Sequence, residues 1–264
     1  MDDEVALSAA QVERFVRDGF VRIEEAFPRS LADACRRILW LGTGCTEDAP
    51  STWTRSVVRL GEIPNPLFVE AANTPRLCAA YDALVGAGRW LPRGSLGTFP
   101  IRFPSPLDAG DCGWHIDASF GPPEEQNFLN WRVNVASRGR ALLMLFLFSD
   151  VGAEDAPTRL RVGSHLPIAR RLAPYGDEGM TIAGLAANDF AESAHCREAL
   201  ATGPAGTVYL CHPFLVHAAQ AHRGRSPRFL AQPGLLPRER RAGSSAASEP
   251  SAVERAIELA LALP

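Results

Sequence analysis

The chain has 264 residues, of which 46% are hydrophobic and 22% charged, so it can bury a core and is not globally disordered. The formal net charge of −3 gives no support for a nucleic-acid binder, and the longest apolar run, residues 141–148, is too short to span a membrane. All 27 basic residues are arginine, which excludes a lysine Schiff base and with it ordinary pyridoxal-phosphate chemistry.

The N-terminal part, about residues 8–88, is expected to be mainly helical. A Ser8 cap and an Asp18-Gly19 stop bracket the first helix. An alternating strand and a second helix towards Trp40 follow, then a polar loop and two short helices, the second with proline at its first position. The predicted elements are a strand at 20–23, a helix from 28, a loop at 42–54 and helices near 66–72 and 75–85.

From about residue 90 to 235, short apolar runs are separated by turn-forming residues. This pattern predicts many short strands in a sandwich or barrel, with no parallel α/β alternation. The expected strands are 95–103, 113–119, 131–135, 141–148, 206–210 and 228–231. Residues 166–204 are expected to form a long, partly helical insertion, which is typical of a lid or binding loop. A final helix, 251–263, is predicted from the capping-box spacing of Ser251 and Glu254.

The six cysteines, at positions 35, 45, 78, 112, 196 and 211, form no CxxC pair and match no zinc motif. The N-terminus is charged and has no apolar stretch typical of a signal peptide. A cytoplasmic protein with reduced thiols is therefore expected.

Metal chemistry is indicated by the sequence Gly113-Trp-His115-Ile-Asp117. On a strand, residues i and i+2 point to the same face, so His115 and Asp117 could direct an imidazole and a carboxylate at one point. A His-x-Asp pair alone is common at protein surfaces and predicts little. A third ligand is needed, and His217 is the best candidate, with His212 as a rival that the adjacent Pro213 places in a turn.

Two imidazoles and one carboxylate on one face of an octahedron leave three positions open, as in non-haem iron(II) oxygenases. A 2-oxo acid needs two open positions and dioxygen needs the third. Arg228, eleven residues after His217, is a suitable partner for the distal carboxylate of 2-oxoglutarate, because guanidinium pairs bidentately with carboxylates and stays charged when buried.

In this order, the residues resemble the phytanoyl-CoA dioxygenase family over about residues 8–235. The similarity runs through Gln11-Val-Glu-Arg-Phe15, His115-Ile-Asp117, Arg161-Val-Gly-Ser-His165, Gly206-Thr207, His217 and Arg228. It implies one oxygenase domain over residues 1–264, mainly β with flanking helices, built on a double-stranded β-helix (a cupin-like jelly roll). It also implies iron(II), 2-oxoglutarate and O2 as cofactor and co-substrates.

By the same resemblance, His115, Asp117 and His217 are expected to bind iron, and Arg228 the co-substrate. Trp131, Arg102 and Thr158 are weaker candidates for the co-substrate pocket; their alternatives are a core residue, a surface cation and a loop residue. The chain departs from the family at His222 and Gly224, where asparagine and serine are frequent, so the hydroxyl that assists the arginine is missing.

The expected reaction is hydroxylation of an unactivated C–H bond in a small, partly apolar metabolite or natural-product intermediate, coupled to conversion of 2-oxoglutarate to succinate and CO2. Desaturation, epoxidation and ring formation stay open, whereas Asp117 argues against halogenation, because halogenases replace this carboxylate. The insertion at 166–204 and the loop at 42–65 are the expected walls of the substrate pocket. The alternatives are a metal-dependent cupin-type enzyme that does not use 2-oxoglutarate, and a non-catalytic jelly-roll binding protein.

Overall fold

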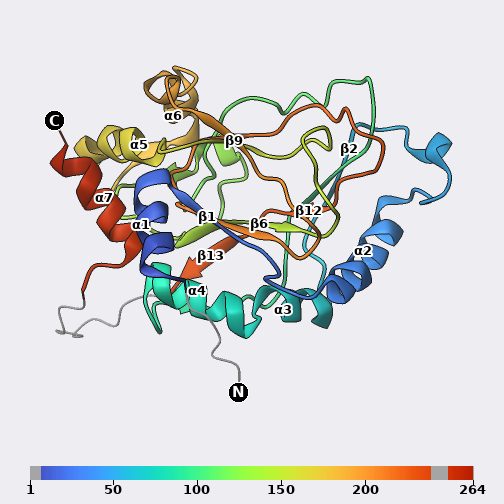
Figure 1. The fold of residues 1–264 in the computed structure, drawn as a ribbon. Helices are drawn as coiled ribbons and strands as arrows, with labels where there is room; N and C mark the ends of the chain where they lie inside the picture. The colour runs from blue at the N-terminus through green and yellow to red at the C-terminus, as the bar shows by residue number, and fades with distance from the viewer. Residues whose placement is uncertain (1–6, 239–248, 264) are drawn as a thin grey trace.

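The computed structural model describes residues 7–238 and 249–263, and in it helices surround a core of antiparallel sheets (Figure 1). The α-helices are α1 (Ala9–Asp18), α2 (Arg29–Thr43), α3 (Pro66–Ala72), α4 (Pro75–Val85), α5 (His165–Leu172), α6 (Ile182–Ala186) and α7 (Ala252–Ala262). The strands are β1 (Phe20–Ile23), β2 (Val57–Leu60), β3 (Trp90–Leu91), β4 (Phe99–Arg102), β5 (Arg132–Val133), β6 (Leu142–Leu147), β7 (Arg159–Arg161), β8 (Met180–Thr181), β9 (Glu198–Leu200), β10 (Val208–Cys211), β11 (His217–Ala218), β12 (Leu230–Ala231) and β13 (Gly234–Pro237).

The first helix begins and ends where its sequence predicts. Ser8 and Gln11 form a reciprocal capping box, and Gly19 ends the helix in the left-handed conformation with φ 84°. Glycine is needed there for a second reason, because a Cβ on Gly19 would lie 2.5 Å from Nδ1 of His165. The predicted helices 66–72 and 75–85 are α3 and α4, and Thr74 caps the latter.

Strands that are distant in the sequence lie side by side in the main sheet. Its order is β1-β10-β6-β13-β3, and β12 also pairs with β6. A smaller sheet has the order β11-β7-β9, and β2 pairs with β4 and β5 with β8. All of these pairings are antiparallel.

The central strand β6 is buried on both faces. Leu142, Met144 and Phe146 belong to the core that includes the helical residues Phe15, Leu39, Phe68 and Leu77. The alternate residues Leu143, Leu145 and Leu147 belong to a second core, with Leu160 of the smaller sheet. Because side chains alternate along a strand, an apolar residue at every position of β6 indicates packing against two layers, as the structure shows.

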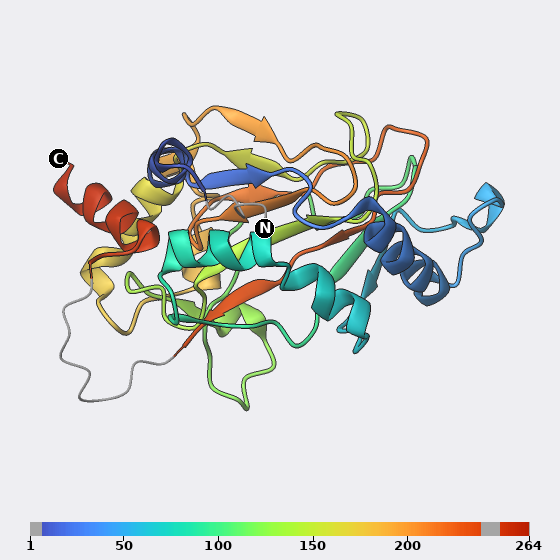
Figure 2. The ribbon, with the colours of Figure 1, turned by 60° about the horizontal axis from the view of Figure 1, so that its bottom comes forward.

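The helices cover the main sheet and one end of the molecule. When the view is turned, α3 and α4 lie in front of the strands of the main sheet (Figure 2). At one end, α7 packs against α1, α4 and α5 (Figure 1). The Ser251–Glu254 capping box predicted for this last helix is present.

One expectation from the sequence needs correction. Residues 113–119 form no strand, since only His115 makes a β-bridge there, and its neighbour β11 is two residues long. The segment 166–204 contains α6 and also β9, which pairs with β7. The other predicted strands are present, several of them shorter than expected.

Of the six cysteines, Cys35 and Cys211 are buried and the other four are partly exposed. In the part of the chain that the structure describes, no helix has the length and apolarity needed to cross a membrane.

Candidate metal centre

Side chains from two distant segments of the sequence converge on one point. One nitrogen each of His115 and His217 and a carboxylate oxygen of Asp117 all lie within 4.8 Å of one another. His217 is buried, with 1% of its surface exposed, whereas His115 and Asp117 are partly exposed. The group can therefore hold a metal ion that is reachable from one side.

Backbone pairing, rather than a long strand, brings the two histidines together. His115 and His217 exchange two main-chain hydrogen bonds, each 2.9 Å long. His217 is anchored in turn by β11, which pairs with β7 in a register that places His217 opposite Leu160. The expected same-face arrangement of His115 and Asp117 is thus achieved without the predicted strand.

The imidazoles are oriented by their own chain. Nδ1 of His115 lies 3.0 Å from the carbonyl oxygen of Gly113, and Nδ1 of His217 lies 3.0 Å from that of Leu215. With Nδ1–H donating to a carbonyl, Nε2 of each ring is the acceptor nitrogen. Nε2 of His217 lies 3.8 Å from Oδ1 of Asp117 and accepts a 2.9 Å hydrogen bond from the side-chain amide of Gln232.

The electrostatics keep Asp117 and His217 in the protonation states that bind metal. Burial alone would raise the pKa of Asp117, but Arg140 and the two imidazoles outweigh burial and lower it. Burial and the neighbouring His115 lower the pKa of His217. At neutral pH the carboxylate is therefore charged and the His217 imidazole neutral, as metal coordination requires.

A second charged group lies around Arg228. The main chains of Arg228 and Arg102 pair through hydrogen bonds of 2.8 and 3.0 Å, and each residue is only 2% exposed. The Arg228 guanidinium donates to the carbonyl oxygens of Ala156 and Pro100. Arg102 donates to Asp111 at 2.5 Å, and Arg59 also pairs with this carboxylate. The interpretation of Arg102 as a surface cation is therefore wrong.

This region carries an excess of buried positive charge. Burial and the nearby Arg102 lower the pKa of Arg228 to about 9. The Nε atoms of Arg102 and Arg228 are both buried and have no hydrogen-bond partner among the described residues. An added carboxylate would relieve both the repulsion and the missing hydrogen bonds.

Of the other residues singled out in the sequence, some lie near the metal group or Arg228 and some lie apart from both. Trp131 is partly buried and lines a cavity beside the metal group, and Thr158 is buried, two residues from the Ala156 carbonyl that holds Arg228. His212 lies in a separate buried pair with His165, their ring centroids 4.9 Å apart, and it is not part of the metal group. His222 is buried against the carbonyl of Ser226.

The cavity beside the metal group has a volume of about 500 Å³. Its lining includes Asp117, Trp131, Phe128, Glu62, Arg93, Arg140 and Gln232. Of the two expected walls, the loop at 42–65 contributes Glu62, whereas the insertion at 166–204 contributes no lining residue; the segment 117–131 takes its place.

Sequence reasoning missed Arg140, Gln232 and Asp111. These residues stand in no motif, and their long or loop-borne side chains reach the site only once strands β4, β6 and β13 are in place. For Arg140, the one signal in the sequence was its position directly before the apolar run 141–148, where an arginine that is drawn into the core would need a charged partner.

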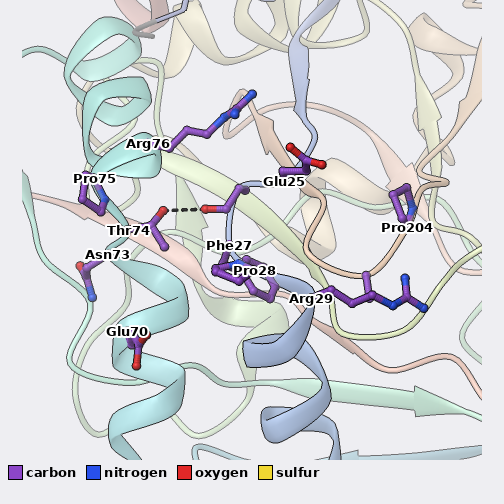
Figure 3. A pocket seen from close by; sticks show the side chains of 12 residues that line it. Glu25, Phe27, Pro28, Arg29, Glu70, Asn73, Thr74, Pro75, Arg76 and Pro204 are labelled. Atoms are coloured by element: carbon purple, nitrogen blue, oxygen red, sulfur yellow. Dashed lines mark hydrogen bonds between the residues drawn. The ribbon is translucent and has the colours of Figure 1, made fainter. Parts of the chain in front are cut away.

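A larger cavity, of about 800 Å³, lies elsewhere. It is lined by the segment after β1 and by residues at the junction of α3 and α4, where the Thr74 hydroxyl donates to the Ala26 carbonyl (Figure 3). None of its lining residues belongs to the metal group or to the arginine cluster. Size alone therefore does not identify the functional site, and the chemistry of the smaller cavity does.

The fold has many solved counterparts. EctD from S. alaskensis in its apoform is 20% identical, with a TM-score of 0.56, and the match covers 89% of this chain and 78% of EctD. HygX from Streptomyces hygroscopicus, solved with nickel, 2-oxoglutarate and hygromycin B, is 18% identical, with a TM-score of 0.55 and 88% of each chain covered. The epimerase SnoN, solved with Fe3+, alpha ketoglutarate and nogalamycin RO, is 19% identical, with a TM-score of 0.59 and coverage of 86% and 81%.

At these identities the structural matches establish the fold alone, a double-stranded β-helix with flanking helices, as expected. No curated protein sequence matches the chain.

A double-stranded β-helix that brings two histidines and one carboxylate together defines the class of non-haem iron oxygenases. More narrowly, the chain belongs to the phytanoyl-CoA dioxygenase family, whose sequence model matches residues 15–230. This confirms the family resemblance seen in the sequence. The cofactor and co-substrates of the family, iron(II), 2-oxoglutarate and O2, are those expected for the chain.

Proposed function

We propose that this iron(II)- and 2-oxoglutarate-dependent oxygenase hydroxylates an unactivated C–H bond of a small, partly apolar metabolite, with His115, Asp117 and His217 binding the iron. The convergence of these three side chains within 4.8 Å carries the proposal. The donor set fits iron(II), because two imidazoles and one carboxylate leave half of an octahedron free. When bound, iron supplies the oxidising power by coupling reduction of O2 to decarboxylation of 2-oxoglutarate.

Arg228 is assigned to the distal carboxylate of 2-oxoglutarate, and Arg102 supports it. Two adjacent buried guanidiniums with unpaired Nε atoms share, among the described residues, the nearby carboxylate of Asp111, 2.5 Å from Arg102. Arg102 thus takes the place of the hydroxyl that the sequence lacks at Gly224. A dicarboxylate would place one carboxylate here and its keto acid end towards the histidines.

Thr158 and Trp131 are assigned to the walls of the co-substrate and substrate pockets. Thr158 follows the Ala156 carbonyl that fixes Arg228, and Trp131 lines the cavity next to Asp117. The aromatic faces of Trp131 and Phe128 suit an apolar part of the substrate. The charged Glu62 and Arg93 on the same cavity suit a polar end. The residues around the cavity hold the substrate beside the metal and exclude water from it.

Anaerobic titration of the apoprotein with Fe(II) and 2-oxoglutarate tests the proposal. A weak visible charge-transfer band that needs both components, and is lost in His115→Ala, is the expected result. If iron binds but 2-oxoglutarate changes neither the spectrum nor O2 consumption, the protein is a cupin-type enzyme of another kind. If no iron binds, the non-catalytic binding protein is the correct reading.

A hydroxylated product distinguishes the reaction from its relatives. Incubation with candidate substrates under 18O2 should give an alcohol that carries the label. An epimerised or cyclised product without incorporated oxygen would contradict hydroxylation while leaving the iron and 2-oxoglutarate dependence intact.

A further inference from the structure

The two oxygens of the Asp117 carboxylate have different surroundings. Oδ1 lies 3.8 Å from Nε2 of His217, another member of the metal group. Oδ2 lies 3.3 Å from Nη1 of Arg140. One oxygen is therefore directed at the metal group and the other is paired with a cation.

Arg140 is held in this position by its own contacts. Nη2 donates a 2.9 Å hydrogen bond to the carbonyl oxygen of Ala118, the residue after Asp117. On its other side lies Gly234, the first residue of β13, where a Cβ would approach Nη1 to 2.7 Å. The absence of a side chain at Gly234 thus leaves the space that the guanidinium occupies.

Packing alone does not explain why the Arg140 guanidinium is held in the interior beside Asp117. Nε and Nη1 of Arg140 are buried and make no hydrogen bond to any described residue, which is unfavourable. Asp117 is the partner of the one ion pair that Arg140 makes within the described chain. The attraction to this carboxylate is what offsets the cost of burying the guanidinium.

The histidines are oriented without a cation, although Gln232 donates to Nε2 of His217. Each is oriented by the carbonyl oxygen two residues before it, Gly113 for His115 and Leu215 for His217. A carboxylate has two equivalent oxygens and can bind a metal through one or through both. A residue from another part of the chain is therefore needed to make the two oxygens of Asp117 inequivalent.

We propose that Arg140 is a positioning residue that restricts Asp117 to binding iron through one oxygen. This inference rests on the proposed function, since it takes Asp117 as a metal ligand. With Oδ2 held by Arg140, the protein supplies three ligand atoms and three positions remain for 2-oxoglutarate and O2. Without Arg140, Oδ2 is free to bind as well and to occupy a position that 2-oxoglutarate needs.

The test separates binding of metal from binding of 2-oxoglutarate. Arg140→Gln removes the charge, Arg140→Lys keeps it, and Arg138→Gln, an exposed arginine two residues away, is the matched control. For each protein, the dissociation constants of Co(II) and Fe(II) are measured first. The visible spectrum of the Co(II) form without 2-oxoglutarate is recorded next, and the Fe(II) form is then titrated anaerobically with 2-oxoglutarate.

We expect Arg140→Gln to lose less metal affinity than the about 10- to 100-fold typical of outer-shell changes, because the freed Oδ2 can bind the metal as well, but to need at least about tenfold more 2-oxoglutarate. Its Co(II) spectrum should change before any 2-oxoglutarate is added, because the coordination number changes. Arg140→Lys should lie between Arg140→Gln and the wild type, and Arg138→Gln should match the wild type.

Three outcomes would overturn the inference. An unchanged 2-oxoglutarate requirement would show that Arg140 does not protect the open position. A weaker response to 2-oxoglutarate with an unaltered Co(II) spectrum would show that Arg140 contacts the co-substrate directly. A large loss of metal affinity alone would make it a general support of the site. Failure of the proposed function would already be seen in the wild type, as absence of the band with Fe(II) and 2-oxoglutarate.

Discussion

The main chains of His115 and His217 are joined by two hydrogen bonds of 2.9 Å, and their imidazole centroids lie 4.3 Å apart. The two proposed metal-binding side chains are therefore placed by peptide groups rather than by other side chains. This arrangement is preorganised before any metal arrives, so little ordering has to occur on binding.

Substitution of either histidine should remove metal binding without unfolding the chain. His115→Ala and His217→Ala delete one of three ligands but leave the backbone pairing intact, so an affinity loss beyond the about 10- to 100-fold of outer-shell changes is expected. Fe(II) titration and circular dichroism measure this. His195→Ala, which removes an exposed imidazole, is the control, and equal metal affinity in all three variants would contradict the assignment.

Replacing Arg228 with leucine should raise the 2-oxoglutarate requirement by about 10- to 100-fold, because a buried carboxylate loses its charged hydrogen-bond donor. Metal affinity should stay at the wild-type level. The measurement is the concentration dependence of succinate formation or of the charge-transfer band. Arg225→Leu, an exposed neighbour, is the control, and an unchanged 2-oxoglutarate requirement in Arg228→Leu would refute the role.

Asp111→Asn should have opposite effects on stability and on co-substrate binding. Arg102, 2% exposed, would lose its carboxylate partner, so unfolding should become easier by about 1–3 kcal/mol. The positive potential around Arg228 would rise, so 2-oxoglutarate should bind a few-fold more tightly. Urea unfolding and 2-oxoglutarate titration measure the two effects, and weaker co-substrate binding in this variant would count against the proposed carboxylate site.

The apoprotein should lose stability as the pH falls below about 6.5, partly through His165. Burial lowers the pKa of His165 to about 4, and the ring bonds the Val16 carbonyl. The unfolded chain therefore binds a proton that the folded chain does not between about pH 6.5 and about pH 4. Stability rises with pH across this window, by about 2 kcal/mol from pH 5 to neutrality for one such imidazole.

Urea unfolding of the apoprotein at about pH 7.5 and about pH 5 measures this dependence. His165→Gln should show a smaller loss of stability on acidification than the wild type. His212 and His217, whose pKa values are also lowered by burial, account for part of the remaining slope. Equal pH dependence in His165→Gln and the wild type would show that His165 is not a source of the effect.

Most of the fold could be predicted from the sequence because its signals are local. The Ser8 and Ser251 caps, the proline at the start of α4 and the apolar run of β6 are read within a few residues. The chain order of His115, Asp117, His217 and Arg228 is a motif, which made the ligand set visible. The strand assumed at 113–119 was wrong although the two side chains do converge, because a single backbone bridge is enough to place them.

The remainder of the site depends on distant packing. Arg102 follows an alternating apolar pattern on β4, and only its pairing with Arg228 shows that its side chain is buried rather than solvated. Arg140 reaches Asp117 only because Gly234, on another strand, leaves space for it. No local pattern encodes such a space.

The contacts of α7 have a consequence for the order in which the protein can be completed during synthesis. This helix packs against α1, α4 and α5, Arg255 pairs with Glu13, and the carbonyl of Val253 lies against His212. The surface that contacts α7 is made by α1, α4 and α5, which are translated much earlier. This surface therefore stays uncovered until α7 has left the ribosome. A chain that stops after β13 would expose this surface. Proteases and chaperones could then bind the truncated chain in preference to a chain in which α7 is packed.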